Sequence, residues 1–210
     1  MTFTAQDAAS WLANPRATRE TLEAFGLATK HRLGQNFLVE DNIIRKIIRL
    51  AELTSDDVVL EVGPGLGTLT VAMLDYVRAV CSIEADRELE GVLAATCKEP
   101  HRDSFVLCMG DALKATPRLV GDAYASLGVF ADAQGKEASG ALIGPNKFVS
   151  NLPYQVAATL ILLFFQEFTT LEQAIVMVQA EVADRISAKP KTKAYGAYTA
   201  KLALYAQVSG

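Results

Sequence analysis

The sequence predicts an α/β fold with a doubly wound, mostly parallel, Rossmann-like sheet. The first observation is the apolar run 58–62, typical of a buried parallel strand, which leads at once into a glycine-rich turn and an apolar helix. The second is that later strand-like runs also end in polar residues. In open α/β sheets the ligand crevice lies at the carboxyl ends of the strands, so these polar residues indicate a binding site.

Composition and charge narrow the class of protein. The 210 residues are half apolar and carry a net charge of −4, so any nucleic-acid footprint must be local. The longest apolar run, 156–165, is about half of the ~20 residues that a membrane span needs. The start of the chain has no basic segment followed by an apolar core. We therefore expect a cytoplasmic monomer with neither a membrane span nor a secretory signal.

Cysteine and histidine usage predicts no metal and no disulfide framework. The cysteines are odd in number and form no C-x-x-C pair, and two of them sit in apolar, strand-like runs. The two histidines lie far apart in the sequence. We expect buried thiols in a reducing compartment. The residues concerned are Cys81, Cys97, Cys108, His31 and His101.

The N-terminal region predicts an appendage followed by a loop. Residues 3–28 indicate one or two short helices interrupted by Asn14-Pro15, which we assign to a helical extension over residues 1–29. We expect the main domain over residues 30–210. Segment 33–38, with a glycine and two amides between apolar residues, is either a plain loop or a lid over a ligand.

The next helix carries two contrasting faces. Asp41 is the expected N-cap, and isoleucines from Ile43 onward form an apolar stripe at helical spacing. The other face holds Arg45, Lys46 and Arg49. These cations form either a solvated face or a phosphate-contact patch.

The glycine-rich turn at residues 63–68 distinguishes between nucleotide ligands. Its glycines fall as G-x-G-x-G, and no Gly-Lys-Ser/Thr follows, so neither the dinucleotide fingerprint nor a phosphate loop is matched. Glu61, at the start of the turn, would repel pyrophosphate but would suit a cation. S-adenosylmethionine, with an ammonium and a sulfonium, fits this field better than NAD.

Two more acids follow predicted strands. Strand 79–83 ends in Glu84, which lies 21 residues after Gly63, the place of the acid that binds ribose hydroxyls in nucleotide-binding sheets. Strand 105–109 is followed by Asp111, placed to accept an adenine amino hydrogen. Asp111 alone would be a helix N-cap, but as a third strand-end acid it indicates a ligand contact.

The second half of the chain predicts a helix near 117–127, an insertion around 128–145 and a fourth strand that runs into Asn151. Asn151, Pro153 and Tyr154 form either a capped strand-to-helix turn or a site for a flat, amino-bearing ring. We expect a helix over 155–168 and a fifth strand over 174–178. A basic run follows, either a solvated loop or one wall of a nucleic-acid groove: Lys189, Lys191 and Lys193.

Six motifs in order carry a resemblance to a known family. The chain resembles the ribosomal RNA adenine dimethyltransferases of the bacterial KsgA type, whose relatives include the Erm enzymes, over roughly residues 30–208. The fold implied is that of the class I S-adenosylmethionine-dependent methyltransferases. The motifs are Gly-Gln-Asn-Phe-Leu at 34–38, Glu-Val-Gly-Pro-Gly-Leu-Gly-Thr-Leu-Thr at 61–70, Ile-Glu-Ala-Asp at 83–86, Gly-Asp-Ala at 110–112, Asn-Leu-Pro-Tyr at 151–154 and Lys-Ala-Tyr-Gly at 193–196.

The resemblance implies a role for each motif residue. It implies dimethylation of the amino nitrogen of two adjacent adenosines near the 3′ end of 16S ribosomal RNA in the small subunit, with Asn151, Leu152, Pro153 and Tyr154 at the reacting base. The cofactor S-adenosylmethionine would be bound by Gln35, Asn36, Leu38, Glu61, Gly63, Gly65, Glu84, Asp111, Ala112 and Asn151.

Two departures from the family pattern qualify this expectation. The chain ends at Gly210, where the family continues into a small helical C-terminal domain, so we expect a truncated methyltransferase domain. The 128–145 insertion is longer than the family pattern predicts. The alternatives are an Erm-type enzyme acting on 23S ribosomal RNA and a non-catalytic ribosome-assembly factor, and a nicotinamide-dependent oxidoreductase is a poor third.

Overall fold

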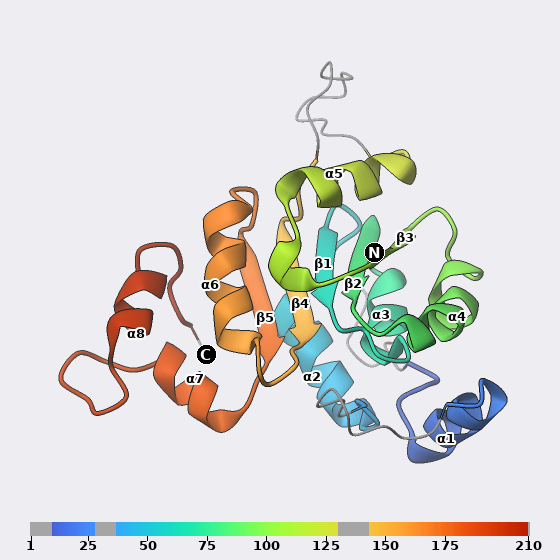
Figure 1. Cartoon of the computed structure of the whole chain (residues 1–210), viewed down its shortest axis with the longest axis horizontal. Coiled ribbons are helices and arrows are strands. Elements are labelled where there is room, and N and C mark those ends of the chain that lie inside the picture. The colour runs from blue at the N-terminus through green and yellow to red at the C-terminus, as the bar shows by residue number, and fades with distance from the viewer. Residues whose placement is uncertain (1–9, 28–36, 130–142, 210) are drawn as a thin grey trace.

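The structure, a computed structural model, describes residues 10–27, 37–129 and 143–209. In this part of the chain, five parallel strands form one sheet in the order β3-β2-β1-β4-β5 (Figure 1). From β1 in the centre, the chain adds β2 and β3 outward on one side and then β4 and β5 outward on the other. This arrangement confirms the predicted doubly wound α/β fold. The strands are β1 Val58–Val62, β2 Ala79–Glu84, β3 Phe105–Met109, β4 Lys147–Asn151 and β5 Gln173–Met177.

Helices cover both faces of the sheet, because successive side chains of a strand point to opposite sides. Val59 and Val80 belong to a core with α2, α3 and α4, whereas Leu60 and Cys81 belong to a second core with α5 and α6 (Figure 1). This two-sided burial explains why β1 and β2 are apolar almost throughout. The helices are α1 Pro15–Ala24, α2 Asp41–Ala51, α3 Thr68–Leu74, α4 Glu90–Leu93, α5 Pro117–Ser126, α6 Ala157–Glu167, α7 Ala180–Ile186 and α8 Ala197–Leu202.

Asn14 and Pro15 begin a helix, and most of the predicted segment before them lies outside the described residues. Asn14 is the N-cap of α1, and its side-chain oxygen accepts the backbone N–H of Ala17 at 2.8 Å. Proline fits the first helical position because its missing N–H has no partner there in any helix. Buried Leu22 joins α1 to the core that contains α2, α3 and α4. The division of the chain at residues 29 and 30 stays a prediction.

Asp41 is the first residue of α2, not its N-cap as predicted. The N-cap is Glu40, which makes no side-chain capping bond. The Asp41 carboxylate instead lies 2.6 Å from Nε of Arg45, one turn along the helix. A carboxylate in the first helical turn also interacts favourably with the helix dipole, so Asp41 stabilises the helix by another route.

The remaining predicted elements are present with small shifts at their ends. The apolar helix predicted after the glycine-rich turn spans Thr68–Leu74, and the one predicted over 155–168 spans Ala157–Glu167. Helices α7 and α8 were not predicted, because each is only six or seven residues long and largely exposed. The 128–145 insertion lies mostly outside the described residues.

The prediction of buried thiols is confirmed for Cys81 and Cys97, whereas Cys108 is half-buried, and all three cysteines are free. The Cys81 and Cys108 sulfurs lie 3.8 Å apart on neighbouring strands. Within residues 10–27, 37–129 and 143–209, no helix is both long and apolar enough to cross a membrane.

Candidate active site

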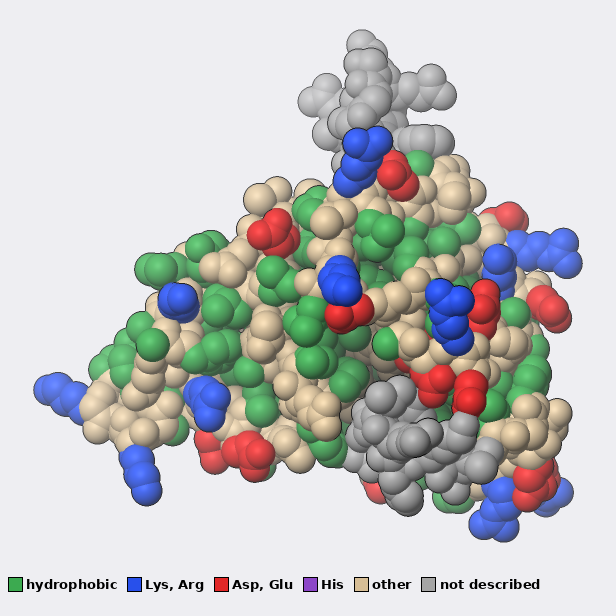
Figure 2. Space-filling view, viewed as in Figure 1, with side chains coloured by type: hydrophobic (Ala, Val, Ile, Leu, Met, Phe, Trp, Pro, Cys, Tyr) green, Lys and Arg blue, Asp and Glu red, His purple; other side chains and the backbone are tan. Residues whose placement is uncertain are grey.

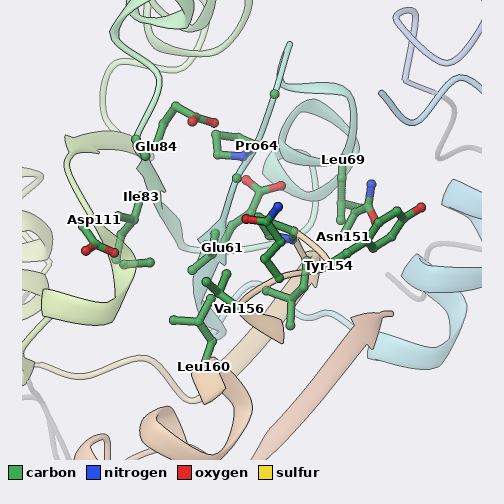
Figure 3. A pocket seen from close by; sticks show the side chains of 18 of the residues that line it. Glu61, Pro64, Leu69, Ile83, Glu84, Asp111, Asn151, Tyr154, Val156 and Leu160 are labelled. Atoms are coloured by element: carbon green, nitrogen blue, oxygen red, sulfur yellow. The ribbon is translucent and has the colours of Figure 1, made fainter. Parts of the chain in front are cut away.

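A pocket of about 240 Å³ opens at the carboxyl edge of the sheet. The ends of β1, β2, β3 and β4 all contribute to its lining, as the topology of parallel strands requires. Figure 3 shows Glu84 and Asp111 on one side of this pocket, Asn151 and Tyr154 on the other, and Glu61 between them. The predicted residues that line it are Leu38, Glu61, Gly63, Gly65, Glu84, Asp111, Ala112, Asn151, Leu152, Pro153 and Tyr154. Gln35 and Asn36, predicted for the same site, lie outside the described residues.

The glycine-rich turn between β1 and α3 lies close to two rings. Gly63 and Gly65 both adopt positive φ angles, 66° and 62°, which side chains rarely tolerate. A Cβ at Gly63 would lie 3.3 Å from Cγ of Pro153, and one at Gly65 would lie 3.3 Å from the ring of Phe37. The positive φ angles therefore favour glycine at both positions, and an added Cβ would also crowd the neighbouring ring.

Glu61 is buried beneath the turn, with 1% of its surface exposed. One carboxylate oxygen, Oε2, accepts hydrogen bonds from the hydroxyls of Thr70 and Ser82, each at 2.7 Å. Burial raises the pKa of Glu61 to about 7, although the bonds from Ser82 and Thr70 lower it. Without a cation nearby, this carboxyl group keeps its proton, and so stays uncharged, up to about pH 7. A ligand ammonium in the pocket would favour its ionised form.

Glu84 is also buried, and its Oε1 accepts the backbone N–H of Asp86 at 2.8 Å. Burial raises the pKa of Glu84, and hydrogen bonds from backbone N–H groups, including that of Gly65, lower it. Both Glu84 and Gly65 line the pocket. The place of Glu84 at the pocket wall is the one that the 21-residue spacing predicts.

Asp111 caps a short turn and also lines the pocket, and its contact with a ligand stays a prediction. Its Oδ1 accepts the backbone N–H of Leu113 at 3.0 Å, which caps the short 3₁₀ turn Ala112–Lys114. The residue is exposed and lines the pocket. Asp86 caps the 3₁₀ turn Arg87–Leu89 in the same way and does not line the pocket.

Asn151 to Tyr154 lead from β4 into α6 at the opposite wall. Leu152 is buried, and its N–H donates to the carbonyl of Met177 on β5 at 3.0 Å. The Pro153 carbonyl accepts the N–H of Val156 at 3.2 Å in the turn that precedes α6. Tyr154 is 38% exposed at the pocket rim. The segment therefore offers a carboxamide, a strand-end carbonyl and an aromatic face at one place.

Sequence reasoning missed the residues that support Glu61. Ser82 pairs with Glu61 in the parallel register of β1 and β2, and Thr70 lies on the helix above them. The available signal for Ser82 was a polar residue inside an otherwise apolar strand. Sequence reasoning also did not assign Phe37 to the site. Its ring lies beside Gly65 and lines the pocket.

The predicted RNA-binding cations differ in their surroundings. Arg45 is ion-paired with Asp41 and half-buried, whereas Lys46 and Arg49 are exposed on α2. Lys189, Lys191 and Lys193 are exposed in the loop between α7 and α8, at the β5 edge of the sheet (Figure 1). On the face in Figure 2, the coloured Lys and Arg side chains are scattered among acidic and apolar ones and form no single basic patch.

Metal-binding side chains do not gather at this pocket. Across residues 10–27, 37–129 and 143–209, no group of three or more His, Cys, Asp or Glu side chains could hold a metal ion. The acids of the pocket come singly from the ends of three different strands.

Comparison with known proteins connects this geometry to a family. The family model described as ribosomal RNA adenine dimethylase matches residues 26–209. A protein of Streptomyces coelicolor named ribosomal RNA small subunit methyltransferase A is 40% identical over 200 residues, covering 94% of this chain and 62% of that protein. Its namesake in Natranaerobius thermophilus is 41% identical, with 95% and 65% covered. The chain thus spans less than two thirds of either relative.

Solved structures agree on the fold. A dimethyladenosine transferase from Plasmodium falciparum superposes with a TM-score of 0.58 at 26% identity, covering 78% of this chain and 50% of that one. The 23S rRNA methyltransferase ErmE superposes with a TM-score of 0.55 at 29% identity, covering 72% and 51%. The class I methyltransferase fold predicted from the sequence is confirmed by these similarities.

Proposed function

Because the chain belongs to the ribosomal RNA adenine dimethylase family, we propose that it is the methyltransferase domain of an enzyme that dimethylates adenosine in ribosomal RNA. The proposed substrate is the amino nitrogen of two adjacent adenosines near the 3′ end of 16S RNA in the small subunit, and the proposed location is the cytoplasm. The observation that supports it most is one pocket that joins the glycine-rich turn and three strand-end acids to Asn151–Tyr154.

The residues of the pocket fit S-adenosylmethionine, which would supply the methyl group on its sulfonium. The backbone of Gly63 and Gly65 lines the pocket, and Glu61 provides a buried carboxylate for an ammonium. Glu84 would bind the ribose hydroxyls and Asp111 the adenine amino group, because both line the pocket at the ends of the second and third strands. Leu38 and Ala112 supply apolar contacts to the same ligand.

Asn151 and the carbonyl that follows it act on the target base. The adenine amino nitrogen is a weak nucleophile because its lone pair is delocalised into the ring. If two acceptors each take one amino hydrogen, the lone pair can be aimed at the methyl group, so positioning is the main catalytic device. The Asn151 side-chain oxygen is one acceptor. The Pro153 carbonyl already uses one of its two lone pairs on the Val156 N–H, so we favour the Leu152 carbonyl as the second acceptor.

Tyr154 and the exposed cations would bind the RNA. The half-exposed ring at the rim can stack on an adenine taken out of its stack, an interaction worth ~1–3 kcal/mol per base. Phosphates would be met by Lys189, Lys191 and Lys193, and by Lys46 and Arg49 on α2. Arg45 contributes less, because its guanidinium already pairs with Asp41.

Transfer of labelled methyl groups tests the function directly. The chain is incubated with S-adenosylmethionine labelled in the methyl group and with separate small and large ribosomal subunits that lack the modification. We expect label in the adenosines of small-subunit RNA. Label in the large subunit would favour the Erm-type alternative. Binding of small subunits without transfer would favour the assembly-factor alternative.

A further inference from the structure

Strands β1 and β4 lie side by side in the middle of the sheet but separate toward the pocket. Their register pairs Val59 with Lys147 and Leu60 with Phe148. Beyond that point β1 continues its pairing with β2, as far as Val62 opposite Ile83. Strand β4 continues with β5 in the same way, as far as Asn151 opposite Met177. The carboxyl edge of the sheet is thus divided between β1 and β4. The glycine-rich turn follows β1 on one side of the division, and Asn151 ends β4 on the other.

One buried side chain bridges the divided edge. The hydroxyl of Ser150, which has no exposed surface, donates to the Val62 carbonyl at 2.6 Å. The same oxygen accepts the Val62 N–H at 3.4 Å. Ser150 therefore satisfies both backbone groups of Val62 where the ladder between β1 and β4 has ended. The next residue on one side is Gly63, and on the other it is Asn151.

A second contact lies immediately above this bridge. The Pro153 ring packs so closely on Gly63 that a Cβ there would lie 3.3 Å from Cγ. Gly63 and Pro153 therefore face each other where the two halves of the pocket meet. The Ser150 hydrogen bonds resist separation of these halves.

We propose that Ser150 is a positioning residue that fixes the distance and angle between the cofactor half of the pocket and the Asn151 half. The inference rests on the proposed methyl transfer, in which the amino nitrogen must lie in line with the methyl group and its leaving sulfur. A misplacement of 1 Å can slow such a step by ~100-fold. Ser150 does not line the pocket itself. It acts through Val62, its hydrogen-bond partner at the end of β1, and through Asn151, the next residue on β4.

The variants that test this role are Ser150→Ala and, as a matched control, Tyr124→Phe. Both remove one fully buried hydroxyl that donates to a carbonyl of β1, since the Tyr124 hydroxyl bonds to Val59 at 2.7 Å. Neither residue lines the pocket, but Ser150 directly precedes Asn151, which does, whereas Tyr124 lies on α5. The two changes are therefore expected to cost similar stability, and only the first is expected to alter the geometry of the site.

The first measurement is amide hydrogen exchange by NMR in the protein without ligands. In Ser150→Ala we expect the Val62 amide to exchange at least about tenfold faster than in wild type, because its buried acceptor is gone. In Tyr124→Phe it should keep the wild-type rate. An unchanged rate at Val62 in Ser150→Ala would overturn the bridge.

The second measurement compares methyl transfer with the binding of S-adenosylhomocysteine. Ser150→Ala should lower kcat by about three- to tenfold and leave the Kd for S-adenosylhomocysteine within twofold, a separation that lost stability alone does not produce. Turnover equal to that of Tyr124→Phe, or an equal loss of S-adenosylhomocysteine binding, would overturn the positioning role. A wild-type chain that transfers no label contradicts the proposed function instead, and amide exchange then decides whether Ser150 holds the strand ends together.

Discussion

The carboxamide of Asn151 ends β4 at the pocket wall, opposite the acids from β2 and β3. In the proposed mechanism its oxygen accepts one hydrogen of the target amino group. We expect Asn151→Ala to lower methyl transfer by at least about 100-fold, the effect of removing one well-placed polar group from a reacting centre. The Kd for S-adenosylhomocysteine should stay within a few fold.

Asn42→Ala is the matched control for this prediction, because Asn42 is an exposed asparagine on α2 that does not line the pocket. It should transfer methyl groups at the wild-type rate. Normal turnover by Asn151→Ala would remove Asn151 from the proposed mechanism.

The ionised form of Glu61, which would bind a ligand ammonium, is also the form that lowers the stability of the folded protein. Its pKa is about 7 in the folded protein and 4.5 ordinarily, so between these values the unfolded chain is ionised while the folded protein keeps a proton. The resulting cost to folding is absent below pH 4.5 and grows as the pH rises. It reaches about 3 kcal/mol above pH 7.

Glu61→Gln removes this cost while keeping the shape of the side chain. Urea unfolding should therefore show Glu61→Gln gaining stability over wild type at pH 7.5 but not at pH 4.5. The same variant should bind S-adenosylhomocysteine more weakly at pH 7.5, because the ligand ammonium loses its carboxylate partner. An identical stability difference at the two pH values would contradict the raised pKa.

At the scale of elements, a buried cluster at the other end of the sheet joins α2 to β4. The Lys147 ammonium donates to the carbonyls of Ala51 at 2.6 Å and Glu52 at 2.9 Å, where α2 ends. It also lies 3.1 Å from Oδ2 of Asp57, whose Oδ1 accepts a bond from Asn146. Burial raises the pKa of Asp57, but the hydrogen bonds from Asn146, Thr54 and Lys147 and the Lys147 charge outweigh it, so the net pKa is lowered.

Lys147→Met should cost about 3 kcal/mol or more of unfolding free energy, because it leaves the buried Asp57 without its charge partner. Urea denaturation at pH 7 measures this cost. The control is Arg16→Met, which breaks the Arg16–Glu20 pair on α1. Arg16 is 88% exposed, so we expect a much smaller change in unfolding free energy than for Lys147→Met. Equal effects of the two substitutions would contradict the proposed importance of burial.

At the scale of the whole molecule, the net charge is −4, so the chain as a whole does not attract RNA. Binding must then depend on local cations. We expect replacement of Lys189, Lys191 and Lys193 by alanine to weaken binding of small-subunit RNA. The slope of log K against log[salt] should become shallower by up to ~0.7–0.9 for each lysine removed. Binding of S-adenosylhomocysteine should not change.

A control with the same change in net charge replaces three exposed cations far from this loop in sequence, Arg16, Arg19 and Lys98, with alanine. If both triple variants lose RNA affinity equally, the effect is one of overall charge, and the α7–α8 loop is not a specific contact.

The sequence by itself determined the five strands, their order in the chain and the polar residues at their ends. Those features are local: an apolar run of five or six residues, a glycine turn and an acid at a fixed spacing each leave a mark in neighbouring positions. Because parallel strands align their carboxyl ends, Glu84, Asp111 and Asn151 were expected at one edge, and the structure places them around one pocket.

The tertiary structure alone decided which side chains act on one another. The bonds from Ser82 and Thr70 to Glu61, the Lys147 cluster and the Ser150 bridge join residues 9 to 96 positions apart. Such contacts depend on the register of neighbouring strands and on which face each side chain takes. A shift of one residue would reverse every face, and no local pattern fixes that register between strands far apart in the chain.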